Sequence, residues 1–92
     1  MIHIVIDGKL LKTKAMFHEH MVKSLAFPYY YGNNLDALWD ILSTTSEVVD
    51  IMLVNQKDLR HSLGDYANAI IALLEEVTKV NSMIKFYQIK DE

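Results

Sequence analysis

The chain has 92 residues, of which 51% are apolar and none is cysteine, and its formal net charge at pH 7 is −3. This length predicts a single domain over residues 1–92, and the lack of cysteine excludes disulfides and thiolate metal sites. No window approaches the roughly 20 apolar residues of a membrane span, and the opening residues lack the basic start of a secretory leader, so we expect a cytoplasmic protein.

The negative charge is concentrated in the middle of the chain. Residues 24–56 hold four acidic side chains and no lysine or arginine, whereas residues 1–23 carry more lysines than acids. Nucleic-acid binding needs a basic face, so this segment argues against a nucleic-acid partner. Complementary charge raises association rates, and the segment therefore favours a basic protein partner.

The first part of the chain predicts a strand, a turn and a helix. Ile2–Ile6 is rich in β-branched residues and is typical of a buried strand, and Asp7-Gly8 marks a turn that could lead as a hairpin into Leu10-Leu11. Thr13 is a suitable cap for a helix that runs to about Leu25. The expected apolar face of this helix consists of Phe17, Met21, Val22 and Leu25.

A loop and a second helix follow. Pro28 should stop the first helix, and Gly32 could take a positive φ in the loop of residues 27–33. Asn34 is a good cap for the second helix, which should end in the polar run of residues 43–46. Its predicted buried stripe is Leu35, Leu38, Trp39 and Leu42. Its predicted solvent stripe is Asp36, Asp40 and Ser43.

The last half predicts two more strands and two more helices. Val48–Val54 has an apolar centre typical of a strand, and a short helix is expected at Gln56–Ser62, broken by Gly64. Asp65 could cap the last helix, which should stop at Asn81. The apolar positions of that helix are Tyr66, Ala69, Ile70, Leu73, Leu74 and Val77. Residues 83–89 predict a third strand, and residues 90–92 a polar tail.

Strands that alternate with helices, without tight hairpins between them, indicate parallel pairing. The sequence therefore predicts an α/β fold with a three-stranded parallel sheet packed against about four helices.

The segment from Tyr29 to Asp40 is unusual for a chain that only has to fold. Three tyrosines and Gly32 stand directly before a helix that carries Asp36 and Asp40 one turn apart, where like charges repel by a few tenths of a kcal/mol. Three consecutive aromatic side chains cannot all be buried. The arrangement indicates a binding surface.

The string Tyr30-Tyr31-Gly32-x-Asn34-Leu35-Asp36-Ala37-Leu38-Trp39-Asp40 resembles the signature of the barstar family, intracellular inhibitors of barnase-type ribonucleases. The resemblance extends over most of the chain. It implies a barstar-like fold in which a helix and the loop before it block the active site of a basic, secreted-type ribonuclease in a one-to-one complex. We also expect the free chain to be a monomer.

The resemblance also implies roles for single residues. Tyr30 would pack on the enzyme, Asp40 would fill its phosphate site, and Glu76 on the last long helix would add a peripheral ion pair. The other positions with an expected role in binding are Gly32, Asn34, Asp36, Trp39 and Ser43. Where the family continues with threonine, glycine and tryptophan, this chain has Ser43-Thr44-Thr45, so one aromatic contact is lost and the partner can differ or bind more weakly.

Several of these residues also have plain structural interpretations. Trp39 could simply pack in the core, Asp36 could be an acid favoured by the helix dipole, and Asp40 could lie on an ordinary solvated face. Glu75 and Glu76 could each pair with Lys79, at i+4 and i+3.

We expect neither an enzyme nor a cofactor or metal site. The histidines are scattered, and the sequence lacks zinc-ligand, phosphate-loop and nucleophile-elbow motifs. Asp36 and Asp40 are close enough for acid–base chemistry, but an exposed helix does not supply the concave pocket that such chemistry needs. The remaining alternative is an immunity or regulatory module that uses the same acidic face on a different basic protein.

Overall fold

A computed structural model describes residues 1–26 and 32–91 of the chain. The strands are β1 (Ile2–Asp7), β2 (Val49–Val54) and β3 (Ile84–Gln88), and they form one parallel sheet in the order β1-β2-β3. The helices are α1 (Lys14–Leu25), α2 (Leu35–Thr44), α3 (Gln56–Leu63) and α4 (Asp65–Val80). The predicted α/β fold with three parallel strands and four helices is confirmed.

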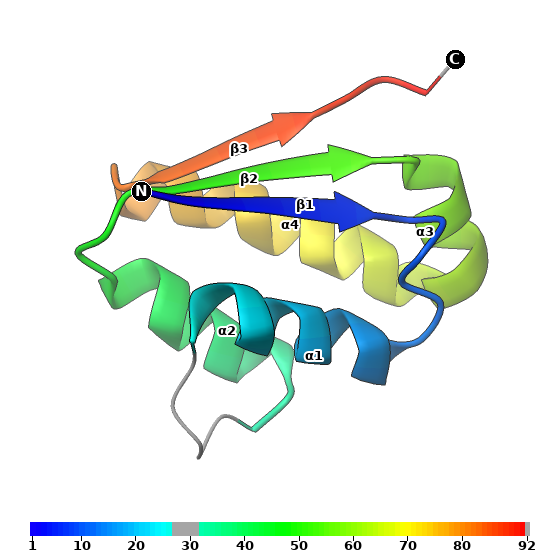
Figure 1. The fold of residues 1–92 in the computed structure, drawn as a ribbon, viewed down its shortest axis with the longest axis horizontal. Coiled ribbons are helices and arrows are strands. Elements are labelled where there is room, and N and C mark those ends of the chain that lie inside the picture. Colours follow the sequence, from blue (N-terminus) through cyan, green and yellow to red (C-terminus); the bar gives the residue numbers. More distant parts are fainter. Residues whose placement is uncertain (27–31, 92) are drawn as a thin grey trace.

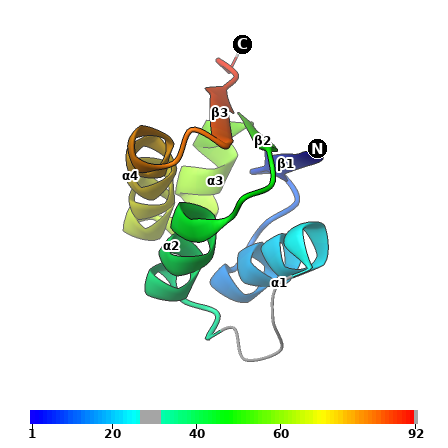
Figure 2. The ribbon, with the colours of Figure 1, turned by 90° about the vertical axis from the view of Figure 1, so that its left-hand side faces the viewer.

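The helices and the sheet form two layers. In the two views of Figures 1 and 2 the helices lie on one side of the sheet, and the other side is left uncovered. The burial of the strand residues shows the same difference between the two faces. One face buries Ile4, Ile51 and Ile84, while the neighbouring residues Val5, Met52 and Lys85 are exposed. Side chains alternate between the faces of a strand, so every second residue enters the core between sheet and helices.

The core contains most of the apolar stripes that the sequence predicts, but in α4 the predicted Ala69 is exposed, and Ala67 and Ile71 are buried instead. Phe17 and Met21 of α1, and Leu38 and Leu42 of α2, are fully buried. The buried residues of α4 are Ala67, Ile70, Ile71, Leu74 and Val77. None of the helices in the described part of the chain is long and apolar enough to cross a membrane.

The start of the chain differs from the predicted hairpin. The carbonyl of Asp7 accepts hydrogen bonds from the amides of Leu10 and Leu11, so the chain makes a tight turn after β1, and Leu11 is buried in the core. The backbone of β1 pairs with a parallel strand, β2, and not with the arm of a hairpin. The hairpin prediction is therefore wrong, because burial of Leu11 under the sheet outweighs local strand pairing.

The helix boundaries follow the expected caps in part. Thr13 accepts a hydrogen bond from the Met16 amide, as expected, and α1 ends with Ala26 in the left-handed conformation (φ 51°). Pro28, the expected stop, lies outside the described residues. Gly64 separates α3 from α4 with φ 60°, but Asp65 is the first residue of α4 rather than its cap, so that prediction is corrected.

The tail is not a free polar end. Both carboxylate oxygens of Asp91 accept hydrogen bonds from the backbone of α3, at 3.0 Å from the Gln56 amide and 3.0 Å from the Lys57 amide. Asn55, which precedes α3, makes no side-chain cap. An aspartate far along the chain thus accepts the hydrogen bonds of the free amides at the start of α3, which a capping side chain would otherwise accept.

Candidate protein-binding site

Asn34 sets the start of α2 and with it the position of the acidic side chains. Its backbone is extended, its Oδ1 accepts a hydrogen bond from the Ala37 amide at 2.8 Å, and its Nδ2 donates to the Gly32 carbonyl at 3.3 Å. The positive φ in this turn belongs to Asn33 (52°). A Cβ at Gly32 would lie 2.9 Å from Asn34 Nδ2, so a larger residue here would have to displace the end of the capping side chain.

Asp36 and Asp40 point away from the core. Both are exposed on α2, on the side opposite the fully buried Leu38 and Leu42. Among residues 1–26 and 32–91, no side chain forms an ion pair with either carboxylate. The hydrogen bonds at Asp40 involve its backbone carbonyl, which accepts from Thr44 Oγ1 at 2.7 Å and Ser43 Oγ at 3.3 Å. Both acidic groups are therefore free to meet an external cation.

Trp39 and Ser43 lie at the border between this surface and the core. Trp39 is partly buried and packs against the core cluster, so the core-packing interpretation of its ring holds for the part that is covered. Ser43 is half-buried and belongs to the solvent stripe only at its edge.

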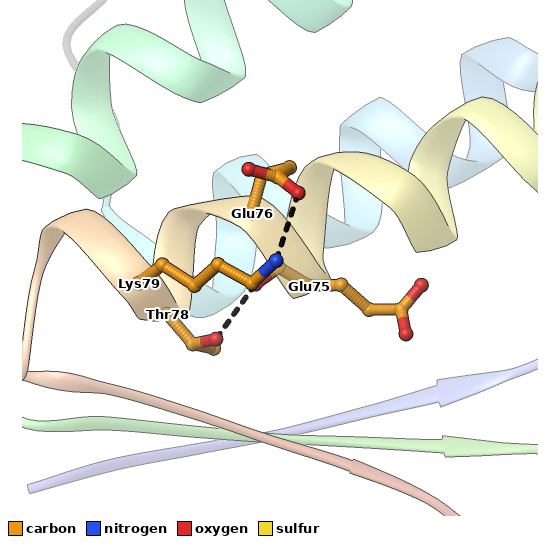
Figure 3. Close-up of polar contacts among 4 residues, drawn as sticks. All are labelled: Glu75, Glu76, Thr78 and Lys79. Carbon is orange, nitrogen blue, oxygen red and sulfur yellow. Dashed lines mark hydrogen bonds and ion pairs between the residues drawn. The ribbon is translucent and has the colours of Figure 1, made fainter.

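Glu76 lies on α4, the helix against which α2 packs. Its carboxylate is exposed and pairs with Lys79 Nζ at 3.2 Å, as Figure 3 shows. Glu75 points away from Lys79 and makes no ion pair with a described residue. The expected i+4 pair of Glu75 with Lys79 is thus not formed, and the ordinary ion-pair interpretation holds for Glu76 instead.

Asn81 fixes the far end of α2, a role that the sequence did not suggest. Its Nδ2 donates to the carbonyls of Leu42 (2.9 Å) and Thr45 (3.0 Å), and thereby ties the end of α4 to the end of α2. The sequence marks Asn81 only as a helix stop. Nothing in its local pattern shows that its side chain reaches back almost forty residues.

Among the other predicted site residues, Tyr30 lies outside the described residues, as do Tyr29 and Tyr31. Within the described ranges the structure brings Gly32, Asn34, Asp36 and Asp40 together along one short stretch. Glu76 lies on a different helix, α4, which packs against α2. The described residues contain no cluster of three or more acidic or histidine side chains that could hold a metal ion.

Comparison with known proteins shows the family to which the chain is similar. The family model described as Barstar (barnase inhibitor) matches residues 1–89. A protein of Bacillus subtilis strain 168, named "Putative ribonuclease inhibitor YrdF", is 35% identical over 74 residues, which cover 79% of this chain and 81% of that protein. From the fold, the placement of the motif on α2 and these matches, we conclude that the chain belongs to the barstar family.

Proposed function

We propose that this protein inhibits a basic barnase-type ribonuclease by placing the acidic side of α2 in the enzyme's active site. The observation that carries the proposal is the pair of exposed carboxylates, Asp36 and Asp40, which have no cationic partner among the described residues. Membership of a family of barnase inhibitors supports the same conclusion.

The chemistry of RNA cleavage explains why carboxylates suit this task. A ribonuclease needs cationic groups around the scissile phosphate, and a carboxylate can occupy that position without being cleaved. Hydrogen bonds from arginine to a carboxylate are among the stronger polar contacts in proteins. Asp40 sits in the middle of a helix held at both ends by Asn34 and Asn81, so little conformational freedom is lost when it binds.

Other residues would complete the contact. Asp36 would add a second anionic group one turn before Asp40, and the part of Trp39 outside the core would lie at the edge of the interface. Gly32 and Asn34 would shape the turn, and Tyr30 would supply aromatic contact area. Ser43 stands where the family has further contacts, and its small side chain predicts a weaker or different interaction there.

Glu76 would act at the periphery. Because it is already paired with Lys79, a cation of the enzyme would have to compete for it, and an exposed pair of this kind is worth at most about 1 kcal/mol. We therefore assign Glu76 a minor share of the binding energy.

We further propose a one-to-one, non-catalytic complex formed in the cytoplasm, where an inhibitor can neutralise a ribonuclease during its synthesis. The alternative is an immunity or regulatory protein that uses the same face on a different basic protein. The two differ in one observable, since only the first predicts loss of ribonuclease activity.

The test is a titration of a barnase-type ribonuclease with the protein and with Asp40→Ala. Activity should fall linearly to zero at one equivalent of the parent protein. Removing Asp40 leaves enzyme cations buried without a partner, which costs about 3–5 kcal/mol and corresponds to a loss of affinity of roughly a hundredfold or more.

The matched control is Asp65→Asn, which removes one negative charge at the exposed first turn of α4. This variant should inhibit like the parent. Equal inhibition by Asp40→Ala and the parent would rule out the proposed mode of binding, and no inhibition by the parent would favour the regulatory alternative.

A further inference from the structure

The C-terminal end of α2 differs from the ends of the other helices. The residues that cap α1, α3 and α4 each donate their backbone amide to the carbonyl four residues earlier. Thr45, the C-cap of α2, is extended (φ −66°, ψ 143°), and in the described part of the chain its amide makes no such bond. The last turn of α2 also contains no basic side chain. Helix ends fray when their last carbonyls lack partners, so the end of α2 depends on support from another element.

Asn81 supplies this support from a fixed position, at the end of the molecule where α2 and α4 both stop and β3 begins (Figure 1). Its backbone is bonded on both sides, because its amide donates to the Val77 carbonyl at 2.9 Å and its carbonyl accepts from the Ile84 amide at 3.1 Å. Its Oδ1 accepts from the Met83 amide at 3.0 Å. These bonds orient the half-buried side chain, whose Nδ2 then donates both of its protons to carbonyls at the end of α2.

Asp40 belongs to the turn that depends on this support. Its carbonyl accepts from Thr44 Oγ1 at 2.7 Å, and Thr44 is the last residue of α2. Leu42, whose carbonyl is bonded to Asn81, lies between the two. Without the Asn81 bonds the helix can unwind from Thr44 back toward Asp40. Asp36 lies in the first turn, which has its own cap, so such fraying does not reach it.

We propose that Asn81 is a positioning residue for inhibition, and that it acts on the partner through Asp40 and not through Asp36. The inference rests on the proposed inhibitor function and deepens it, because it assigns a residue of the α4–β3 junction to the binding of the enzyme. A partner that binds only molecules with the last turn of α2 formed has an affinity reduced by the fraction of such molecules. The two caps of α2 would then serve different carboxylates, Asn34 the first and Asn81 the second.

Inhibition constants of the parent, of Asn81→Ala and of a matched control measure this effect. If Asn81→Ala lowers the fraction with a formed last turn to about a tenth, its affinity for a barnase-type ribonuclease falls about tenfold. The control is Thr13→Ala, which removes the side-chain cap of α1, a bond of 3.1 Å from the Met16 amide, and likewise changes no charge. It should lose stability and bind like the parent. The end points of the titrations give the concentration of folded inhibitor, so the unfolded fraction does not enter the constants.

Double-mutant cycles separate positioning from a general loss of stability. If Asn81 acts through Asp40, Asn81→Ala should weaken binding little further in the Asp40→Ala protein. In the Asp36→Ala protein it should keep its full effect of about tenfold, because the two sites do not interact. A purely structural role would give the same effect in both backgrounds.

Amide hydrogen exchange examines α2 without the enzyme. In Asn81→Ala the amides of Ser43 and Thr44 should exchange faster relative to the amide of Leu38, which lies nearer the start of the helix. In Thr13→Ala the ratio of these rates should be that of the parent.

The outcomes distinguish the two levels of the argument. A parent protein that does not inhibit overturns the proposed function and this assignment together. If the parent inhibits, the assignment alone is overturned by an Asn81→Ala variant that inhibits as well as Thr13→Ala, by equal effects of Asn81→Ala in the two aspartate backgrounds, or by unchanged exchange at the end of α2.

Discussion

At the scale of single residues, His18 is the clearest feature that the sequence did not reveal. It is 1% exposed on α1, and its Nε2 lies 2.6 Å from Tyr66 Oη of α4, while Lys14 Nζ sits 4.5 Å from the centre of the Tyr66 ring. Burial lowers the pKa of His18 and raises the pKa of Tyr66. The sequence showed only that the histidines are scattered, and it could not show that His18 links two helices.

The lowered pKa of His18 predicts a stability that depends on pH. The unfolded chain binds a proton at His18 near its ordinary pKa of about 6.5, whereas the folded protein resists it, so the unfolded state holds more protons in between. The contribution of His18 to the free energy of unfolding should therefore be complete above about pH 6.5, and it should be lost as the pH drops through the pKa of His18 in the folded protein.

Urea denaturation at a series of pH values measures this effect. His18→Gln, which keeps a polar side chain but cannot titrate, should be less stable at neutral pH and should lose less stability on acidification. His61→Gln, at an exposed position of α3, is the control and should follow the parent. A parent protein whose stability is unchanged between pH 7.5 and 5 would contradict this account of His18.

At the scale of elements, local patterns determine most of the structure. Apolar spacing places α2 and α4, the β-branched runs place the strands, and Thr13 and Asn34 cap their helices as their residue types predict. What the sequence cannot show are partners distant along the chain. The contact of Asp91 with α3, the contact of Asn81 with α2 and the burial of Leu11 all depend on the final packing. The local spacing of residues does not indicate these contacts.

The cap of α2 gives a prediction at this scale. Asn34→Ala removes the acceptor of the Ala37 amide and should cost about 1 kcal/mol of unfolding free energy, whereas Asn34→Asp keeps an oxygen in the same place and should cost little. Asp36 lies in the first turn of α2, which the cap holds in place. The alanine variant should therefore also inhibit a ribonuclease less well than the parent, and the loss should exceed what the fraction of unfolded protein accounts for.

Urea unfolding and inhibition measured on the same three proteins separate these effects. If the first turn of α2 matters for binding, amide hydrogen exchange at Ala37 and inhibition should change together in Asn34→Ala. Unchanged stability in Asn34→Ala would show that the cap contributes nothing.

At the scale of the whole molecule, charge is distributed unevenly over the fold. Residues 24–56, which include α2, contain no lysine or arginine, whereas lysines 9 and 57 line the hollow at the ends of the strands together with Lys90. A basic enzyme that approaches this protein is attracted to one side of it. Such attraction acts before contact and governs how fast the complex forms.

The last prediction concerns the salt dependence of that encounter. The screening length falls from about 30 Å at 0.01 M to about 3 Å at 1 M ionic strength, so the association rate constant with a barnase-type ribonuclease should fall steeply over this range. The dissociation rate constant should change much less, because contacts buried in the complex are screened little. Stopped-flow fluorescence of the partly exposed Trp39, the only tryptophan, can follow binding directly. Asp36→Asn should associate more slowly than the parent at low salt and approach it at high salt, whereas a rate constant independent of salt in the parent would mean that the acidic side of α2 does not guide the partner.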